Sequence, residues 1–169
     1  TETGRLSSSR PNMQNIPSPH QDVDKFDYKY PIKRLFTTRF DGGVVLQADY
    51  SALEMRILGL RANDPGMTEA FLQGKDIHKN TASIMQGKPE DEISSDERQA
   101  AKAVAFGLVY GKQSYSLAGD LGVTPDEAEV LVEKFFAGKP AVRDFIDYAH
   151  ELLERSGYVA TMNGNRRML

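Results

Sequence analysis

The most informative part of the sequence is residues 94–111, which read SSDERQAAKAVAFGLVYG. Ser94 and Glu97 form the S-x-x-E pattern of a capping box, and Gly111 stands where helices commonly end. The pattern predicts a helix over about residues 96–110. Small apolar residues recur along it at helical spacing and predict a face that packs inward, namely Ala101, Val104, Ala105, Leu108 and Val109.

Another face of the same helix carries two cations followed by two aromatic residues at i, i+4 spacing, Arg98, Lys102, Phe106 and Tyr110. Residues four apart share one face, with a drift of about 40° per step. Cations can hold phosphates and rings can stack on a base or sugar, so this face suits a nucleoside triphosphate. A solvated cationic edge beside two core aromatic residues is the alternative, and the spacing alone favours it.

The apolar run Val44–Ala48 predicts a β-strand buried on both faces that ends on Asp49. A carboxylate at the end of such a strand is held rigidly and is a common Mg²⁺ ligand, although a strand-end or cap role explains Asp49 as well. Ser51 and Glu54 form a second capping box. This box predicts a helix to about residue 62 and accounts for Glu54 without any ligand.

The rest of the chain predicts more helices and a closing hairpin. Helices are expected over about residues 68–73, 77–85, 115–121, 124–137 and 140–156, with Asp76 capping the second of them. His78, one turn inside its helix, is expected at the surface. Residues 158–162 and 165–169, joined by Asn163-Gly164, predict a β-hairpin with a type I′ turn. The fold class is therefore α+β and predominantly helical, with one strand that needs partners.

The composition is that of one globular domain of 169 residues. The absence of cysteine excludes disulfides and thiolate catalysis and suits a cytoplasmic protein. No apolar run reaches the roughly 18 residues of a membrane span, and no signal-peptide pattern is present. The net charge of −3 hides a basic excess in residues 1–40 and an acidic cluster in residues 90–97. Net charge therefore does not identify a partner.

Several segments resemble, in collinear order, the family A DNA polymerases, the bacterial DNA polymerase I group. Residues 49–56, DYSALEMR, resemble motif A, and residues 98–111 resemble motif B on the fingers helix. Residues 3–8 and 11–17 are similar to the stretch that contacts primer and template. Shorter matches are GKDIH at 74–78, GYV at 157–159 and GNRR at 164–167.

The resemblance implies a domain organisation. Residues 1–62 would form part of the palm, with some of its antiparallel sheet, and residues 63–157 the fingers. Residues 158–169 would form a hairpin that leads back to the palm. The fingers helix would swing to close on a correct base pair.

The resemblance also implies template-directed addition of dNTP to a primer 3′-hydroxyl by two Mg²⁺ ions, in DNA replication and repair. Asp49 and the Tyr50 carbonyl would ligate metal, and Lys102 would be catalytic by giving a proton to pyrophosphate. Glu54 would exclude a 2′-hydroxyl. The implied dNTP-binding residues are Tyr50, Ser51, Glu54, His78, Arg98, Lys102, Phe106 and Tyr110. The implied DNA-binding residues are Arg5, Asn12, Gln14, Asn15, Gln113, Tyr115, Arg166 and Arg167.

A few positions depart from the family pattern. Ala52 and Ala105 stand where the family commonly has Gln and Asn, and Phe106 in place of Tyr implies discrimination against dideoxynucleotides. The family's motif C, His-Asp-Glu, which carries the second metal carboxylate, has no counterpart in this sequence. We therefore expect the isolated chain to be inactive and to work with the remaining palm and thumb of the polymerase.

Two other functions stay open. One is a non-catalytic nucleotide- or DNA-binding module in which Asp49 is structural. The other is an RNA polymerase of the related single-subunit family, which Glu54 and the stretch Asn12–Pro17 disfavour. Membrane partners are not expected.

Overall fold

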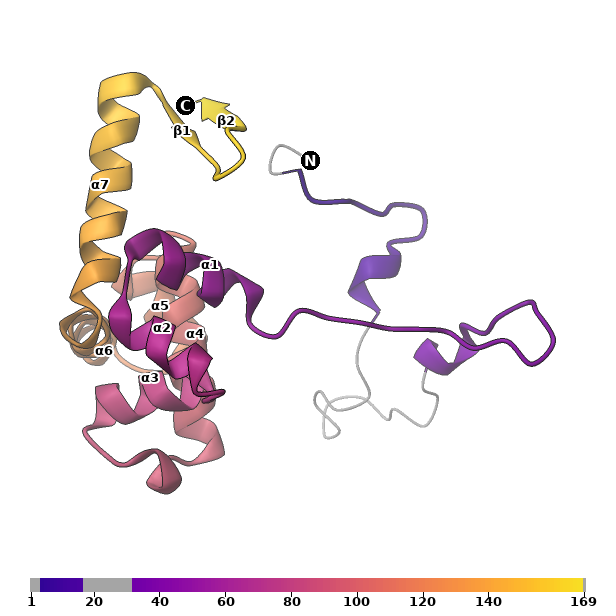
Figure 1. The fold of residues 1–169 in the computed structure, drawn as a ribbon. Helices are drawn as coiled ribbons and strands as arrows, with labels where there is room; N and C mark the ends of the chain where they lie inside the picture. Colours follow the sequence, from indigo (N-terminus) through magenta and orange to yellow (C-terminus); the bar gives the residue numbers. More distant parts are fainter. Residues whose placement is uncertain (1–3, 17–31, 169) are drawn as a thin grey trace. The chain divides into compact units, whose positions relative to one another are not determined.

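The computed structural model describes residues 4–16 and 32–168 (Figure 1). The expectations for Thr3, Pro17 and Leu169 lie outside these residues. The chain divides into two compact units, Thr1–Tyr50 and Ser51–Leu169, and each is described by itself.

The described part of the first unit contains two short 3₁₀ helices, η1 (Met13–Asn15) and η2 (Ile32–Leu35). The predicted strand over residues 44–48 is wrong, because these residues form no regular secondary structure and pair with no described strand. Val44 is 87% and Leu46 is 90% exposed. A strand exists only through hydrogen bonds to a neighbour, and the described residues of this unit supply none.

The described part of the second unit, residues 51–168, contains seven α-helices followed by a hairpin. The elements are α1 (Leu53–Ala62), α2 (Pro65–Leu72), α3 (Ile77–Gln86), α4 (Ser95–Val109), α5 (Ser114–Leu121), α6 (Pro125–Gly138), α7 (Pro140–Ser156), β1 (Tyr158–Ala160) and β2 (Arg166–Met168), with a 3₁₀ turn η3 (Glu90–Glu92) between α3 and α4. The two strands pair antiparallel, with Val159 opposite Arg167. The predicted α+β class, predominantly helical with a C-terminal hairpin, is confirmed.

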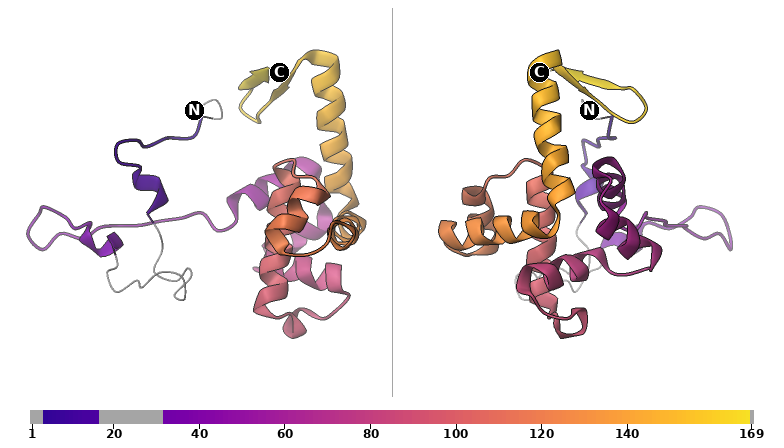
Figure 2. Two further views of the ribbon diagram at one scale, coloured as in Figure 1. Left: turned by 180° about the vertical axis from the view of Figure 1, so that it is seen from behind. Right: turned by 60° about the vertical axis from the view of Figure 1, so that its left-hand side comes forward.

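Helix α3 packs against α4 and α6, α5 packs against the same two helices, and α1 packs against α2 and α7. Both views of Figure 2 show α7 extending from the other helices toward the hairpin. The predicted inward face of α4 lies in the core, with Ala101, Val104 and Ala105 at most 2% exposed and Val109 half-buried. These small side chains let the neighbouring helices approach α4 closely.

Two glycines lie where helices are in close contact. A Cβ on Gly107 of α4 would collide with Leu117 of α5, and a Cβ on Gly138 at the end of α6 would collide with Ile84 of α3. A side chain at either position would force Leu117 or Ile84 to shift from its packed position.

Most predicted helix starts are confirmed. Asp76 caps α3 through its side chain, and capping boxes open α4 at Ser94 and α6 at Thr124. The box predicted at Ser51 and Glu54 is wrong: Ala52 occupies the N-cap position of α1 in the left-handed conformation (φ 50°), with no side-chain cap bond. The helix therefore starts one residue later than the box requires, and alanine at the N-cap has no oxygen to accept a backbone N–H.

Two further boundaries differ from the prediction. Helix α2 begins at Pro65 instead of residue 68, because the Asp64 carboxylate accepts the Met67 N–H and proline fits the first helical position. The hairpin turn is not type I′, since that turn needs positive φ at both central residues and Asn163 lacks it. Gly164 alone is positive, at 81°, and its N–H donates to the Thr161 carbonyl.

No helix in residues 4–16 and 32–168 is both long and apolar enough to cross a membrane.

Candidate functional site

A row of polar and aromatic side chains runs along α4 and is joined by residues of α3 and α1. We call it the α4 row and define it as Glu54, His78, Arg98, Lys102, Phe106 and Tyr110. All six belong to the second unit, so their mutual positions are part of one compact body.

The aromatic part of the row is continuous. The Phe106 and Tyr110 rings stack at 15° with centroids 6.3 Å apart, and the His78 ring centroid lies 5.6 Å from that of Phe106. The Lys102 Nζ lies 6.0 Å from the Phe106 centroid, the outer limit of a cation–π contact. At the far end, the Tyr110 hydroxyl is 3.4 Å from Glu54 Oε1. Ring faces and cations therefore follow one another along one surface of α4.

The cationic end of the row is anchored to α3. Arg98 Nε donates to Asp76 Oδ2 over 2.7 Å. Asp76 Oδ1 accepts the backbone N–H groups of His78 and Lys79 at 2.9 and 3.1 Å. One carboxylate thus caps α3 and binds the first cation of α4.

The expectation that His78 is a surface residue is wrong, because its ring packs on Phe106 and it is only 7% exposed. Burial lowers the pKa of His78, and the charges of Lys102 and Arg98 lower it further, against an opposing effect of Asp76. The imidazole is therefore neutral at neutral pH. A neutral ring can donate one hydrogen bond without adding a third positive charge.

The pKa of Asp76 is also shifted. Burial raises it, but the hydrogen bond from Arg98, the backbone N–H groups of Lys79 and His78 and the Arg98 charge outweigh burial and bring it below the ordinary value. Asp76 is therefore ionised at neutral pH, and its charge faces that of Arg98.

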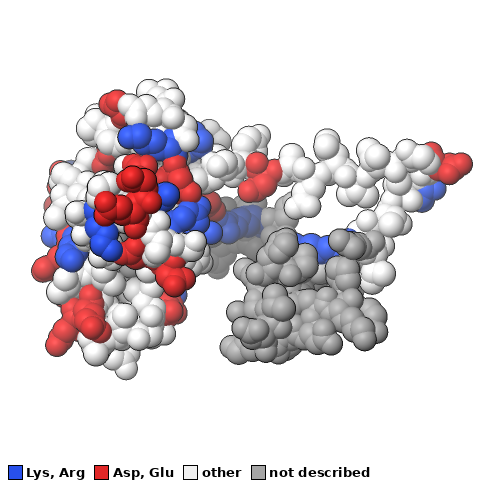
Figure 3. All heavy atoms as spheres, turned by 90° about the horizontal axis from the view of Figure 1, so that it is seen from below, with Lys and Arg blue, Asp and Glu red and all other residues white. Residues whose placement is uncertain are grey.

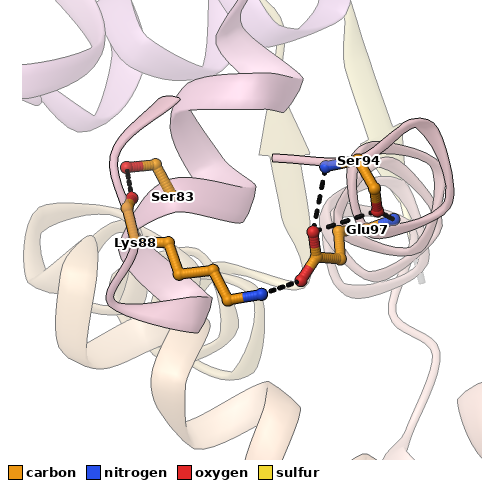
Figure 4. A network of polar contacts seen from close by, with 4 residues as sticks. All are labelled: Ser83, Lys88, Ser94 and Glu97. Carbon is orange, nitrogen blue, oxygen red and sulfur yellow. Dashed lines mark hydrogen bonds and ion pairs between the residues drawn. The ribbon is translucent and has the colours of Figure 1, made fainter. Parts of the chain in front are cut away.

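A polar network fixes the start of α4 (Figure 4). Glu97 Oε2 accepts hydrogen bonds from the Ser94 N–H and hydroxyl, and Glu97 Oε1 accepts one from Lys88 Nζ at 2.7 Å. The Ser83 hydroxyl donates to the Lys88 carbonyl. The Lys88 hydrogen bond is the main cause that lowers the pKa of Glu97 to about 2. The network thus joins the end of α3 to the first turn of α4.

Acid should weaken this network. The pKa of Glu97 in the folded protein is about 2 against an ordinary 4.5, so its stabilisation is complete above pH 4.5 and is lost as the pH falls towards 2. We expect the gap in Tm between the protein and its Glu97→Gln variant to shrink over that window. Thermal melts from pH 6 to pH 2.5, with Asp91→Asn as a control variant, measure it. A gap that stays constant over this range would contradict the assignment.

The candidate metal ligands belong to a different unit of the chain from the α4 row. Asp49 and Tyr50 end the first unit and are exposed there, while Ser51 begins the second unit. The Ser51 carbonyl accepts Arg56 Nε at 2.9 Å. Among the described residues, no three His, Cys, Asp or Glu side chains gather as a metal-binding group. A carboxylate and a backbone carbonyl are nevertheless the hard oxygen donors that suit Mg²⁺.

The candidate DNA-binding residues of the first unit lie in a locally folded turn. The Asn12 side chain accepts the Gln14 N–H, and Gln14 Nε2 donates to the Leu6 carbonyl, both at 3.1 Å. Arg5 and Asn15 flank these contacts in the sequence, and both are exposed.

In the second unit, Gln113 precedes α5 and Tyr115 on its first turn is 79% exposed. The Arg166 guanidinium lies 4.5 Å from the Tyr158 ring centroid, and Arg167 pairs with Val159 across the hairpin. On the face shown in Figure 3, acidic and basic side chains are interspersed over the helical unit.

Sequence reasoning missed one member of this region. Asp76 was expected only as a helix cap, and its ion pair with Arg98 spans 22 residues of sequence. No local pattern signals a pair at that separation, whereas the cap itself is signalled by an Asp directly before a helix.

The sequence and the fold of this chain were compared with those of known proteins. The whole chain, residues 1–169, matches the family described as DNA polymerase family A. It is 39% identical over 165 residues to DNA polymerase I of Deinococcus radiodurans, and this match covers 98% of this chain and 16% of that protein. It is 38% identical over 167 residues to the thermostable DNA polymerase I of Thermus aquaticus, with 99% and 19% covered.

A solved structure described as the POL domain of Pol1 from M. smegmatis, in complex with DNA primer-template and dNTP, is also similar. It is 33% identical, with a TM-score of 0.77, and the similarity covers 100% of this chain and 29% of that one. The chain thus spans only a small part of the length of each relative. From the match over all its residues, this chain belongs to DNA polymerase family A.

Proposed function

We propose that this chain is part of a DNA-directed DNA polymerase and that the α4 row binds the incoming dNTP. The observation that carries the proposal is the order along one surface of α4, where two cations are followed by two stacked rings. The M. smegmatis structure described as a complex with primer-template and dNTP supports the same class of ligand.

The cationic end suits a chain of phosphates. Arg98 and Lys102 stand one helical turn apart, which is about 6 Å along the axis, so two positive charges can meet neighbouring phosphate groups. Neutral His78 adds a hydrogen-bond donor beside them. We propose that Lys102 also transfers a proton to the departing pyrophosphate, since an ammonium group can act as a general acid.

The aromatic end suits the base and sugar. The Phe106 and Tyr110 rings offer a stacking surface, and base–aromatic stacking tolerates any base. Glu54, half-buried and 3.4 Å from the Tyr110 hydroxyl, would lie under the sugar. A carboxylate there would leave no room for a 2′-hydroxyl.

This role of Glu54 gives a prediction. Glu54→Ala should lower the preference for dNTP over rNTP by about 10- to 200-fold, the range for loss of one steric or polar discrimination. The ratio of kcat/KM values for dCTP and CTP in primer extension measures it. Glu69→Ala on α2 serves as a matched control. A ratio unchanged in Glu54→Ala would remove Glu54 from sugar selection.

We propose Asp49 and the Tyr50 carbonyl as the residues of this chain that hold Mg²⁺. When bound, the metal supplies charge stabilisation for the attacking and leaving oxygens. The chain's own contribution is to present oxygen donors directly before α1, which carries Glu54.

The remaining assignments follow the same proposal. Residues 1–62 belong to the palm and residues 63–157 to the fingers, while residues 158–169 form a hairpin that returns to the palm. Primer-template DNA contacts the residues Arg5, Asn12, Gln14, Asn15, Gln113, Tyr115, Arg166 and Arg167. The chain works with the rest of the palm and the thumb, in the cytoplasm of a bacterial or phage-infected cell, with an organelle as the alternative location.

Primer extension tests the proposal. The protein that carries this sequence should extend a primed template with complementary dNTP in Mg²⁺, and chelation of the metal should stop the reaction. Binding of DNA and dNTP without any extension would instead indicate a non-catalytic module. Extension with rNTP at equal efficiency would indicate an RNA polymerase.

A further inference from the structure

The Asp76–Arg98 ion pair lies at the cationic end of the α4 row and has no role in the proposed function above. Its two side chains are 39% and 38% exposed, and it links the first turn of α3 to the first turns of α4. We propose that Asp76 is a positioning residue for dNTP binding, which holds the Arg98 guanidinium in the orientation that binds the triphosphate. This inference rests on the proposed function.

The geometry of the pair leaves Arg98 able to bind phosphate. A guanidinium carries five N–H donors, one on Nε and four on the terminal nitrogens. Asp76 engages Nε, so this contact leaves the terminal nitrogens available, and those form the fork that grips phosphate oxygens in two parallel bonds. An acid that held the terminal nitrogens instead would compete with the ligand.

Asp76 is itself held firmly. Its Oδ1 accepts two backbone N–H groups at the start of α3, which leaves Oδ2 for Arg98. The Asp76 carboxylate is therefore held in place by the backbone, and its hydrogen bond restricts the rotamers of the flexible Arg98 side chain. A pre-ordered arginine loses less rotamer freedom when the triphosphate binds.

Charge supports the same role. Arg98 and Lys102 repel each other at i, i+4 spacing on α4, and the charges of both cations and of Asp76 act on the buried His78. The negative charge of Asp76 offsets this repulsion in the absence of nucleotide. The same negative charge also repels the triphosphate. Whether removal of this charge lowers or raises the affinity for dNTP therefore decides between a positioning and a competing role.

The decisive variant is Asp76→Asn. The amide oxygen can still cap α3, because Asn is as good an N-cap as Asp, while the amide nitrogen faces Arg98 as a donor and breaks the pair. We expect binding of dNTP to weaken about three- to fivefold, the scale of a partly exposed charged pair, with binding of the corresponding dNMP nearly unchanged. Tm should stay close to that of the unaltered protein.

Arg98→Ala provides the second arm of a double-mutant cycle. If Asp76 acts through Arg98, then Asp76→Asn should have no further effect on dNTP affinity in the Arg98→Ala background. Asp120→Asn is the matched control, since it removes a comparably exposed ion pair with Lys112 that lies off the α4 row. Titration of dNTP and dNMP into the protein that carries this sequence, bound to primer-template, gives all the affinities.

The outcomes separate cleanly. Tighter dNTP binding in Asp76→Asn would mean that Asp76 competes with the triphosphate for Arg98. Equal loss of dNTP and dNMP binding would mean that Asp76 has only a structural role. An additive effect of Asp76→Asn in the Arg98→Ala background would mean the same. Any of these overturns the inference. If Arg98→Ala itself leaves dNTP affinity unchanged, the proposed function fails instead, independently of Asp76.

Discussion

Asp49→Ala, introduced into the protein that carries this sequence, is expected to lower the single-turnover rate of primer extension by about 10³-fold, with DNA affinity changed little. Loss of one group that stabilises transition-state charge costs about 10²–10³ in rate, and a metal ligand affects the charge on both reacting oxygens. DNA affinity depends instead on phosphate contacts by cations and polar side chains elsewhere. Rapid-quench measurement at saturating dNTP and Mg²⁺ gives the rate.

Asp41→Ala is the matched control, because Asp41 is another exposed acid of the same unit. It should leave the rate within about twofold, as for an ordinary surface substitution. A fall of less than tenfold in Asp49→Ala would show that Asp49 is structural. The non-catalytic module would then be the better description.

The second large effect is expected for Lys102. Lys102→Ala should lower kcat/KM for dNTP by about 10²- to 10³-fold, since it removes both a phosphate-binding charge and the proposed proton donor. Lys102 is half-buried and its Nζ lies 6.0 Å from the Phe106 ring centroid, so its ammonium group is held beside the stacking surface. Steady-state kinetics over a range of dNTP concentrations measure kcat and KM separately.

Lys102→Arg separates the two roles. Arginine keeps the positive charge but does not give up a proton at ordinary pH, so we expect KM for dNTP to change little and kcat to fall. Lys134→Ala, at an exposed position of α6, is the control for loss of a surface charge. Equal kcat in Lys102→Arg and the unaltered protein would exclude the proton-transfer role while leaving phosphate binding intact.

Local patterns were enough to predict α4. The capping box at Ser94 and Glu97, the apolar spacing and the terminal Gly111 all act within a few residues, and the structure reproduces the start, inner face and end of the helix. The same holds for the Asp76 cap of α3. Such features are decided by hydrogen bonds between near neighbours, which a sequence displays directly.

Features that depend on distant partners were not predictable in this way. The run Val44–Ala48 has strand composition, but a strand forms only where a neighbour offers hydrogen bonds. The burial of His78 follows from packing against Phe106, and the Asp76–Arg98 pair from the packing of α3 on α4. The failed capping box at Ser51 reflects a backbone conformation at Ala52 that residue type does not specify.

The central claim is that the α4 row binds the triphosphate of a nucleotide. Comparison of nucleotides with three, two and one phosphate groups tests this claim most directly. Affinities of the DNA-bound protein for dNTP, dNDP and dNMP should rise with each added phosphate. In Arg98→Ala and Lys102→Ala the dNTP affinity should fall towards that of dNMP, because these cations act on the phosphates. Equal affinities for the three nucleotides would contradict the account, and so would an unchanged rise in affinity with phosphate number in both variants.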